Sequence, residues 1–373
     1  MRVMFVCGGT AGHINPALAV AAEVKRRDPE AKILFVGSGR QLENRLIPQE
    51  GYRLVNITVR GFDRRLSPAM IAGNIRALNT LRSALRESEQ ILRAFAPDAV
   101  VGTGGYVCYP VLSKAADLGI PTFIHESNAV PGLTTRLLAG KVDKILLAFE
   151  DTPELRRYAH KTVYVGTPVR GDFGRYPKHE ARLKLGIDGR PLVVTFWGSL
   201  GAERMNEMMV DFIEMNLRSR LFNHIHATGG GPAGRQALLD KLSARRVALP
   251  LPDWVDIRPY ISNMAEVMAA ADLVVCRAGA STIAELTYLG KPAILVPSPN
   301  VTNNHQLKNA RRLEKAGAAV VLEERELTGE KLYETARRLL IDLPGLHRMS
   351  QAMKGLGVPD SAKRVVEMIF SAC

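Results

Sequence analysis

The chain has 373 residues, 46% of them hydrophobic, and a formal net charge of +13. Its length favours two domains over a single core. No apolar run approaches the roughly 18 residues of a membrane-spanning helix, and the apolar run after Met1 is too short for a signal peptide. Four scattered cysteines without a CxxC pair argue against a zinc site or a disulfide framework and favour a reducing, cytoplasmic setting.

The strong positive charge indicates an anionic partner, which is a nucleic acid, an acidic membrane surface or a phosphorylated substrate. Nucleic acid is the weakest of these alternatives. The chain contains no nucleic-acid-binding motif, its aromatic residues make up only 6%, and its charge is spread over both halves. We therefore expect a membrane surface or a phosphorylated substrate.

Short Val/Ile/Leu-rich runs, each followed by a glycine-rich turn and a helical pattern, alternate along the chain. This order is typical of parallel sheets in α/β domains. The predicted strands are Val3–Val6, Ile33–Val36, Ala99–Val101, Thr122–Ile124, Leu192–Phe196, His224–Ala227, Leu273–Val275 and Ala293–Val296.

A weak internal repeat relates the two halves, since residues 97–128 and 270–300 share the same succession of strand, small-residue turn, helix and strand. We expect residues 1–165 and a C-terminal helix over about 358–373 to form one domain, and residues 166–357 the other. Both are predicted to be Rossmann-like doubly wound parallel sheets, with a ligand cleft between them at the carboxyl ends of their strands.

Glycine-rich turns follow several predicted strands. In the first, Gly8–Gly12 precede Asn15-Pro16, which we interpret as the N-cap and first residue of a helix. Such a turn offers backbone N–H groups to an anion. It is neither a P-loop nor a dinucleotide fingerprint, because no Gly-Lys-Ser/Thr follows and Cys7 replaces the first glycine. Similar turns begin at Gly102, Gly198 and Arg277.

The segments GGTAGHINPAL, GTGGYV, HESN, GTPVR, GSLGAERMN and RAGASTIAEL together resemble the MurG family of N-acetylglucosaminyltransferases, in order and over essentially the whole chain. The resemblance implies the two-domain GT-B fold. It implies transfer of GlcNAc from UDP-GlcNAc to the MurNAc 4-hydroxyl of lipid I, an undecaprenyl-linked acceptor, giving lipid II for peptidoglycan synthesis with inversion at the sugar.

An inverting transfer needs a base for the acceptor hydroxyl. A histidine titrates near neutral pH and suits this task, and the resemblance favours His13 as the base or as an acceptor-positioning group. Glu126 is a second candidate base. The alternative for Glu126 is a buried carboxylate tied to loop amides. The GGTAGH loop, with Thr10, Ala11 and Gly12, is expected to face the acceptor.

The donor needs groups that meet the charge of UDP and hold its sugars. Ser199 at a helix N-terminus suits one phosphate, and Arg170 suits a bidentate contact, unless it instead pairs with an acid such as Asp172. The resemblance implies that the remaining donor contacts come from Ser281, Thr282, Glu285, Gln306, Asn128 and the Ile261 backbone. For Glu285 the alternative is a first-turn acid on a helix dipole.

Four positions depart from the family pattern. Ala11 replaces a common glycine, which matters only where the backbone needs a positive φ. Trp197 precedes the third glycine turn, and a bulky ring there is expected to alter how that turn meets the donor. Ala227 stands where the family commonly has Gln, and His305 precedes the single matching Gln306.

The scheme requires no metal or cofactor, and the chain has no DxD motif. Asp28-Pro29-Glu30 looks similar to one but indicates a helix-ending turn. Between residues 64 and 86, arginines lie among apolar residues at helical spacing without an acid, which favours an anionic membrane surface over an ordinary packed helix once the acceptor is lipid-linked. These arginines are Arg64, Arg65, Arg76, Arg82 and Arg86.

Three alternatives stay open at this point. The chain could be a UDP-GlcNAc 2-epimerase or a diacylglycerol glucosyltransferase on the same fold. It could also be a non-catalytic nucleotide-sugar-binding subunit that docks a partner at the membrane. The favoured hypothesis is that the chain is an inverting hexosyltransferase and a peripheral protein at the cytoplasmic face of the cell membrane.

Overall fold

The computed structural model describes residues 1–59, 68–198, 201–301 and 304–373, apart from the side chains of residues 41 and 68–79. The chain forms two compact units: the first unit is Met1–Arg170 with Val358–Cys373, and the second unit is Gly171–Gly357. The boundary between them lies five residues after the one that the sequence indicated. The last segment from Val358 belongs to the first unit, where the sequence placed it.

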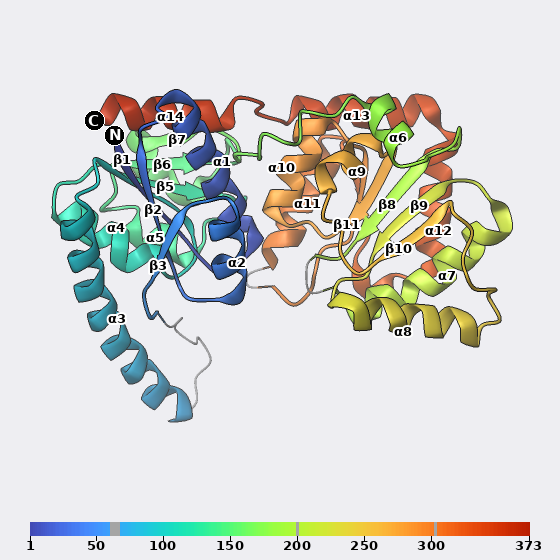
Figure 1. Ribbon diagram of the computed structural model, residues 1–373, viewed down its shortest axis with the longest axis horizontal. Helices are drawn as coiled ribbons and strands as arrows, with labels where there is room; N and C mark the ends of the chain where they lie inside the picture. Colours follow the sequence, from blue (N-terminus) through green and yellow to red (C-terminus); the bar gives the residue numbers. More distant parts are fainter. Residues whose placement is uncertain (60–67, 199–200, 302–303) are drawn as a thin grey trace. The chain divides into compact units, whose positions relative to one another are not determined.

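The first unit contains a seven-stranded parallel sheet (Figure 1). Its strands in spatial order are β3 (Arg53–Asn56), β2 (Lys32–Gly37), β1 (Arg2–Cys7), β4 (Ala99–Gly104), β5 (Thr122–Glu126), β6 (Lys144–Leu147) and β7 (Thr162–Tyr164). Central strand β1 is apolar without alternation because both of its faces are covered. Val3 and Phe5 face one layer of helices, and Met4 and Val6 face the other.

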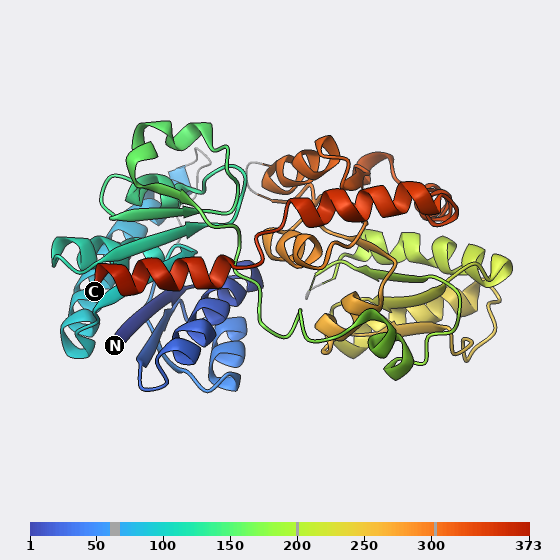
Figure 2. The same ribbon diagram turned by 90° about the horizontal axis from the view of Figure 1, so that it is seen from above.

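Two helical layers cover this sheet. On the Phe5 side lie α1 (Ala11–Arg27), α2 (Gln41–Gln49) and α14 (Ser361–Ala372). On the Met4 side lie α3 (Pro68–Phe95), α4 (Cys108–Asp117), α5 (Leu133–Leu138) and the 3-10 helix η1 (Pro153–Lys161). Figure 2 shows the C-terminal helix α14 beside α1, where Val365 and Ile369 enter the same core as Phe5. The last helix thus completes the first unit.

Helix α1 begins earlier than the sequence indicated. Asn15 and Pro16 were expected to be its N-cap and first residue, but Thr10 is the N-cap in an extended conformation, and Pro16 lies inside the helix. Proline has no N–H, so its place in the second turn removes one hydrogen bond to the Gly12 carbonyl without preventing the turn before it. As a result, Ala11, Gly12 and His13 are helical residues.

The second unit repeats this architecture with six parallel strands. Their spatial order is β10 (Val255–Arg258), β9 (Asn223–Ala227), β8 (Leu192–Phe196), β11 (Leu273–Cys276), β12 (Ala293–Leu295) and β13 (Ala319–Val321). The helices are α6 (Lys178–Lys184), α7 (Glu203–Ser219), α8 (Gly231–Ala244), α9 (Met264–Ala270), α10 (Ala280–Leu289), α11 (His305–Lys315), η3 (Glu324–Glu326), α12 (Gly329–Ile341) and α13 (Leu343–Gly355). Helices α7, α8 and α12 share one buried core with the β8 and β11 side chains Val193 and Val275.

The strand order reverses once in each sheet. Strand β1 lies between β2 and β4, and strand β8 lies between β9 and β11. In each sheet, the chain first adds strands on one side of the central strand and then adds the remaining strands on its other side. In open α/β sheets, ligands bind beyond the carboxyl ends of the strands at such a switch point. The turns that follow β1 and β4, and those that follow β8 and β11, are the glycine-rich turns singled out in the sequence.

Candidate active site

The two glycine turns of the first unit contact each other at its switch point. The Gly8 amide donates to the Gly104 carbonyl oxygen at 3.2 Å. Gly104 and Gly105 have φ angles of +121° and +92°, and a Cβ on Gly105 would lie 2.7 Å from the Gly8 oxygen. Only glycine adopts these conformations readily and allows so close an approach of two backbones. Glycine at these two positions therefore allows the turns after β1 and β4 to contact each other.

His13 lies between the two turns in the first helical turn of α1. Its Nδ1 lies 2.7 Å from the Gly8 carbonyl oxygen, and Thr103 donates its hydroxyl to the His13 carbonyl at 2.6 Å. A carbonyl oxygen can only accept, so Nδ1 carries the proton and the neutral ring keeps the Nε2 lone pair. A Cβ on Gly104 would lie 2.5 Å from Cδ2 of this ring. The site holds one imidazole in one tautomer, with Nε2 as its basic atom.

The carboxylate of Glu126 is committed to its own loop. It is 5% exposed, and its oxygens accept from the amide and the side chain of Asn128, from the Gly132 amide and from the Thr135 hydroxyl at 2.6–3.2 Å. Four donors from its own loop occupy the carboxylate, so it is not directed at a substrate hydroxyl. The geometry favours the alternative weighed for Glu126, a buried staple of the loop, and leaves His13 as the better base.

His125, the neighbour of Glu126, is unsuited to be a base. It is 2% exposed, its Nε2 donates to the Gly166 carbonyl at 2.8 Å, and its Nδ1 lies 3.1 Å from the Ser127 hydroxyl. Burial lowers the pKa of this imidazole below its usual value. Both ring nitrogens are occupied, so His125 ties β5 to the segment after β7.

Glu43 is a buried acid that the sequence analysis did not identify. It lies in the first turn of α2, is fully buried, and accepts hydrogen bonds from the Gly9, Ser38 and Gly39 amides and the Ser38 hydroxyl. The carboxylate thereby joins the turn after β1 to the turn after β2. An acid in the first turn of a helix that follows Gly-Ser-Gly was the available signal. Its meaning depends on β1 and β2 being neighbours.

Four other predicted residues of the first unit lie either at the start of α1, just after the β1 turn, or at Arg170, where the first segment of the unit ends. Thr10 is exposed, and Ala11 and Gly12 begin α1, where the first amides have no partner within the helix. Ala11 is not among the described residues with a positive φ, so its replacement of glycine is unstrained. Arg170 lies 3.4 Å from Glu50 in an ion pair, an acid that the sequence analysis did not consider.

In the second unit, the turn after β11 leads into α10. Gly279 is the extended N-cap, and Ser281, Thr282 and Glu285 follow within the first two turns, all partly exposed. The helical spacing expected for Thr282 and Glu285 is therefore present. Arg277 at the end of β11 donates to Glu324 at 2.6 Å in an ion pair whose side chains are 12% and 10% exposed. This pair anchors the turn.

Gln306, Ile261 and Ser199 have different outcomes. The side-chain oxygen of Gln306 accepts from the Ser298 amide at 2.9 Å, which leaves its NH₂ group as the donor toward a ligand. The Ile261 side chain is 1% exposed and belongs to the core. A contact to uracil would therefore use the Ile261 backbone. Ser199 lies outside the described residues.

Trp197, which was expected to alter the third glycine turn, has its side chain in the core of the second unit. Its ring is 3% exposed and packs in the core of the second unit beside His226. Thr195 bridges two buried imidazoles, with its hydroxyl 2.6 Å from His226 Nδ1 and 2.9 Å from His224 Nε2. An indole buries more favourably against such neighbours than in water, so the core takes the ring.

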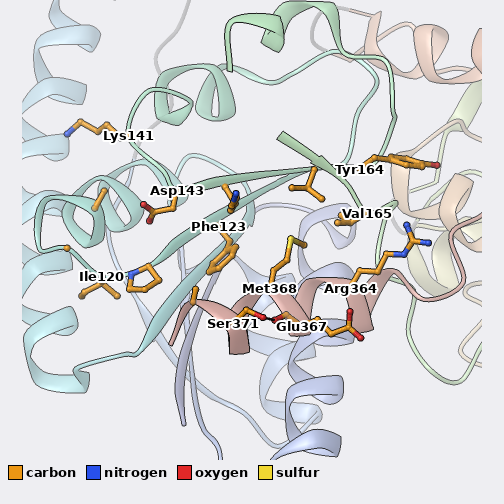
Figure 3. A pocket seen from close by; sticks show the side chains of 16 residues that line it. Ile120, Phe123, Lys141, Asp143, Tyr164, Val165, Arg364, Glu367, Met368 and Ser371 are labelled. Atoms are coloured by element: carbon orange, nitrogen blue, oxygen red, sulfur yellow. Dashed lines mark hydrogen bonds between the residues drawn. The ribbon is translucent and has the colours of Figure 1, made fainter. Parts of the chain in front are cut away.

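The described parts of the chain contain cavities away from these residues. One of about 710 Å³ lies between α14 and strands β5–β7, and its lining includes Phe123, Tyr164, Arg364 and Met368 (Figure 3). A second of about 290 Å³ lies where α7 and α8 begin. Neither is lined by a residue predicted to bind substrate, so neither is the predicted site.

Two arginines of the predicted membrane-facing stretch can be located. Arg82 and Arg86 are exposed on α3, and Ala84 between them is buried against the sheet. Arg64 and Arg65, and the side chain of Arg76, lie outside the described residues. No helix within the described ranges has the length and apolarity to cross a bilayer.

Family comparisons match both units. Residues 3–147 match the glycosyltransferase family 28 N-terminal domain, and residues 192–365 match the glycosyltransferase family 28 C-terminal domain. The chain belongs to glycosyltransferase family 28. Two units of like topology, each with glycine turns at its switch point, agree with a two-domain family 28 chain.

Full-length relatives narrow the assignment within family 28. The UDP-N-acetylglucosamine–N-acetylmuramyl-(pentapeptide) pyrophosphoryl-undecaprenol N-acetylglucosamine transferase of Acetivibrio thermocellus is 43% identical over 370 residues, covering 99% of this chain and 97% of its own. The crystal structure of Acinetobacter baumannii MurG superposes with a TM-score of 0.75 at 28% identity, covering 99% of both chains. These matches confirm the resemblance to the MurG family.

A more distant structure shares the fold alone. The UDP-GlcNAc 2-epimerase from Neisseria meningitidis, solved with UDP-GlcNAc bound, superposes with a TM-score of 0.67 at 14% identity, covering all of both chains. The predicted GT-B architecture of two Rossmann-like parallel-sheet domains is confirmed by these superpositions. The full-length relatives, by contrast, favour the transferase over the epimerase.

Proposed function

We propose that this family 28 chain transfers GlcNAc from UDP-GlcNAc to the MurNAc 4-hydroxyl of undecaprenyl-linked lipid I, which yields lipid II and UDP with inversion at the sugar. The name shared by the full-length relatives supports the donor and acceptor. The proposed chemistry rests on one observation: the Nδ1–H of His13 donates to the Gly8 carbonyl, so Nε2 is the basic atom of the ring.

The first unit supplies the base in this proposal. Nε2 of His13 takes the proton of the acceptor hydroxyl as its oxygen bonds to the sugar C1 and the bond from C1 to the UDP oxygen breaks. Such proton transfer contributes roughly 100-fold or more to a rate. The exposed Thr10 and the first turn of α1 lie next to His13 and are proposed to contact the acceptor.

The second unit supplies the donor contacts. The first turn of α10, with Ser281 and Thr282, offers N–H and O–H donors to phosphate or ribose, and Glu285 one turn on accepts from a sugar hydroxyl. Gln306 donates its NH₂ group to GlcNAc, the Ile261 backbone holds uracil and Ser199 holds a phosphate. Arg170 and Asn128, which belong to the first unit, are proposed to add further donor contacts. The proposal includes no metal or cofactor, because these donors meet the charge of the departing diphosphate.

A transfer assay with purified lipid I and radiolabelled UDP-GlcNAc tests this function. We expect lipid II and UDP in equal amounts. UDP-ManNAc or a glucosylated diacylglycerol as the product would overturn the proposal in favour of another enzyme on this fold. Binding of UDP-GlcNAc without UDP release above background would indicate a non-catalytic subunit instead.

We also propose that the chain acts as a peripheral protein on the cytoplasmic face of the cell membrane. The lipid-linked acceptor and the net charge of +13 support this location. Arg82 and Arg86 on α3 are exposed and suited to meet anionic lipid headgroups, together with Arg64, Arg65 and Arg76. Sedimentation with vesicles of anionic phospholipid, compared with zwitterionic vesicles, tests the location; equal binding to both would contradict it.

A further inference from the structure

The peptide group between Gly8 and Gly9 is held on both of its edges. The Gly8 carbonyl oxygen accepts from His13 Nδ1 at 2.7 Å, and the Gly9 amide donates to Glu43 Oε1 at 2.5 Å. These two groups belong to one planar unit, because the C=O of a residue and the N–H of the next residue share a conjugated peptide bond. His13 and Glu43 therefore contact opposite edges of the same peptide group.

The structure requires Glu43 to act as an acceptor at both oxygens. Oε1 accepts from the Gly9 amide and the Ser38 hydroxyl, and Oε2 accepts from the Ser38 and Gly39 amides at 2.6 and 3.1 Å. Backbone N–H groups can only donate, so three of the four contacts need a lone pair on the carboxyl group. Hydrogen bonds of this kind stabilise the ionised form of a buried acid. Glu43 is accordingly a buried carboxylate next to the loop.

The space around this carboxylate is shaped for it. A Cβ on Gly37 would lie 2.7 Å from Oε2, and a Cβ on Gly8 would lie 3.1 Å from Oε1. Any side chain at Gly37 would displace the carboxylate from the loop. Gly8 in the turn after β1 and Gly37 at the end of β2 thus leave room for one buried acid.

A negative charge beside the N–H of a peptide group changes the electron density on its carbonyl oxygen. A carboxylate that accepts from the N–H shifts electron density toward the carbonyl oxygen, and linked hydrogen bonds strengthen one another in this way. The Gly8 oxygen then binds the Nδ1–H of His13 more strongly. A stronger hydrogen bond at Nδ1 fixes that tautomer and makes Nε2 more basic, as carboxylates do when they contact a histidine directly.

We propose that Glu43 is a positioning residue of the transferase, which acts through the Gly8–Gly9 peptide group to hold His13 in the Nδ1–H tautomer and to raise the basicity of its Nε2. The inference rests on the proposed function, in which Nε2 is the base. It gives that site a carboxylate–peptide–imidazole relay, in which the peptide group takes the place that a direct carboxylate contact has in catalytic triads.

Two further titratable groups lie near this loop. His125 on β5 lies near enough for the two imidazoles to repel each other when charged. The Arg40 guanidinium, just before α2, lies 3.7 Å from where a Cβ on Gly9 would be. His125 is buried with a lowered pKa and is therefore neutral near pH 7, so the Arg40 guanidinium is the cation beside this turn. Removal of the Glu43 charge leaves that cation unopposed, and the basicity of Nε2 should fall.

The first test uses nitrogen NMR of the full chain with ¹⁵N-labelled histidine, assigned by comparison with a His13→Ala variant. In the unaltered protein near neutral pH, we expect a protonated Nδ1 and an unprotonated Nε2 at His13. A His13 with its proton on Nε2 would overturn the relay, and this measurement needs no variant at Glu43. Glu43→Gln keeps the size of the side chain, removes its charge and turns one acceptor atom into a donor. In this variant we expect the His13 titration to move to lower pH.

The matched control is Ser38→Ala. The Ser38 hydroxyl donates its hydrogen bond to the same Oε1 at 2.7 Å rather than to the Gly8–Gly9 peptide group. We expect the His13 titration in this variant to stay close to that of the unaltered protein. Equal shifts in Glu43→Gln and Ser38→Ala would mean that loop distortion, rather than the carboxylate charge, controls His13.

The second test is the pH profile of transfer to lipid I. For Glu43→Gln we expect kcat to fall about 10- to 100-fold, the KM for UDP-GlcNAc to change little and the acid limb of kcat to move to lower pH. In a His13→Ala background, the same change should have little further effect on kcat. An unchanged profile with an active unaltered enzyme would overturn the relay alone. An inactive unaltered enzyme would overturn the proposed function, and the NMR result would still decide the relay.

Discussion

Gly104→Ala is the most direct perturbation of the proposed base. A Cβ at this position would lie 2.5 Å from His13 Cδ2 and 2.8 Å from Nε2. Carbon atoms in contact prefer about 3.5–4.0 Å, so the ring must move by about 1 Å. A displacement of 1 Å can cost roughly 100-fold in rate, because reacting atoms lose their alignment. We expect kcat for transfer to lipid I to fall by about this factor, with a much smaller change in donor binding.

Two comparisons separate this effect from a general loss of stability. Gly104 has a φ of +121°, so alanine also strains the backbone there by about 1–3 kcal/mol. Gly51→Ala is the matched control, since Gly51 has a φ of +80° and nothing lies within 4 Å of its added Cβ. Thermal unfolding should report destabilisation in both variants, while only Gly104→Ala should lose the large factor in kcat.

A double-mutant cycle gives the refuting result. His13→Ala alone is expected to lower kcat by roughly 100-fold or more. If Gly104→Ala acts through the His13 ring, adding it to His13→Ala should change kcat little, because the displaced group is already gone. Losses that multiply in the double variant would show that Gly104 affects turnover by another route, and would refute the steric argument.

Three further predictions concern other parts of the chain. Burial lowers the pKa of His226 to about 3 and holds that of His224 well below its usual value. The unfolded chain binds protons at these histidines below about pH 6.5 and the folded chain does not, so the free energy of unfolding should decrease as pH falls from 6.5 toward 3, by up to about 5 kcal/mol for His226. Denaturant unfolding at pH 7 and pH 4.5 checks this, and His226→Gln should lose less stability than the unaltered protein; equal losses would contradict it. The double change Arg82→Glu, Arg86→Glu should weaken binding to anionic vesicles by at least about 30-fold, since each basic residue contributes about 1 kcal/mol, whereas Lys331→Glu in the second unit should have a small effect in the same sedimentation assay. Turnover should be unchanged after treatment with EDTA, measured by UDP release; a loss that Mg²⁺ restores would contradict the metal-free scheme.

Much of the architecture follows from local patterns. The run Val3–Val6 is apolar at every position, which predicts a parallel strand covered on both faces, and β1 has both faces buried. The repeated order of strand, turn and helix predicted two like units and placed the segment from residue 358 with the first. These predictions succeeded because hydrophobic burial and backbone geometry leave a periodic record in the residues themselves.

Local signals were misleading where a side chain's environment is set by distant segments. Asn15-Pro16 has the composition of a helix start, yet α1 begins at Ala11 because the turn after β1 closes onto the turn after β4. Trp197 lies next to a glycine turn in sequence, but its ring packs into the core of the second unit. In both cases tertiary packing outweighs the local preference.

The residues themselves determined the family, the two α/β units, the glycine turns and His13 as a candidate base. The tertiary structure decided which acid serves that base. Glu126 lies in a motif but binds its own loop, whereas Glu43 lies in no motif and reaches the Gly8–Gly9 peptide group. The contact joins residues 34 positions apart. It exists because β1 and β2 are parallel neighbours whose turns emerge at the same edge of the sheet, and a sequence read in one dimension does not contain that adjacency.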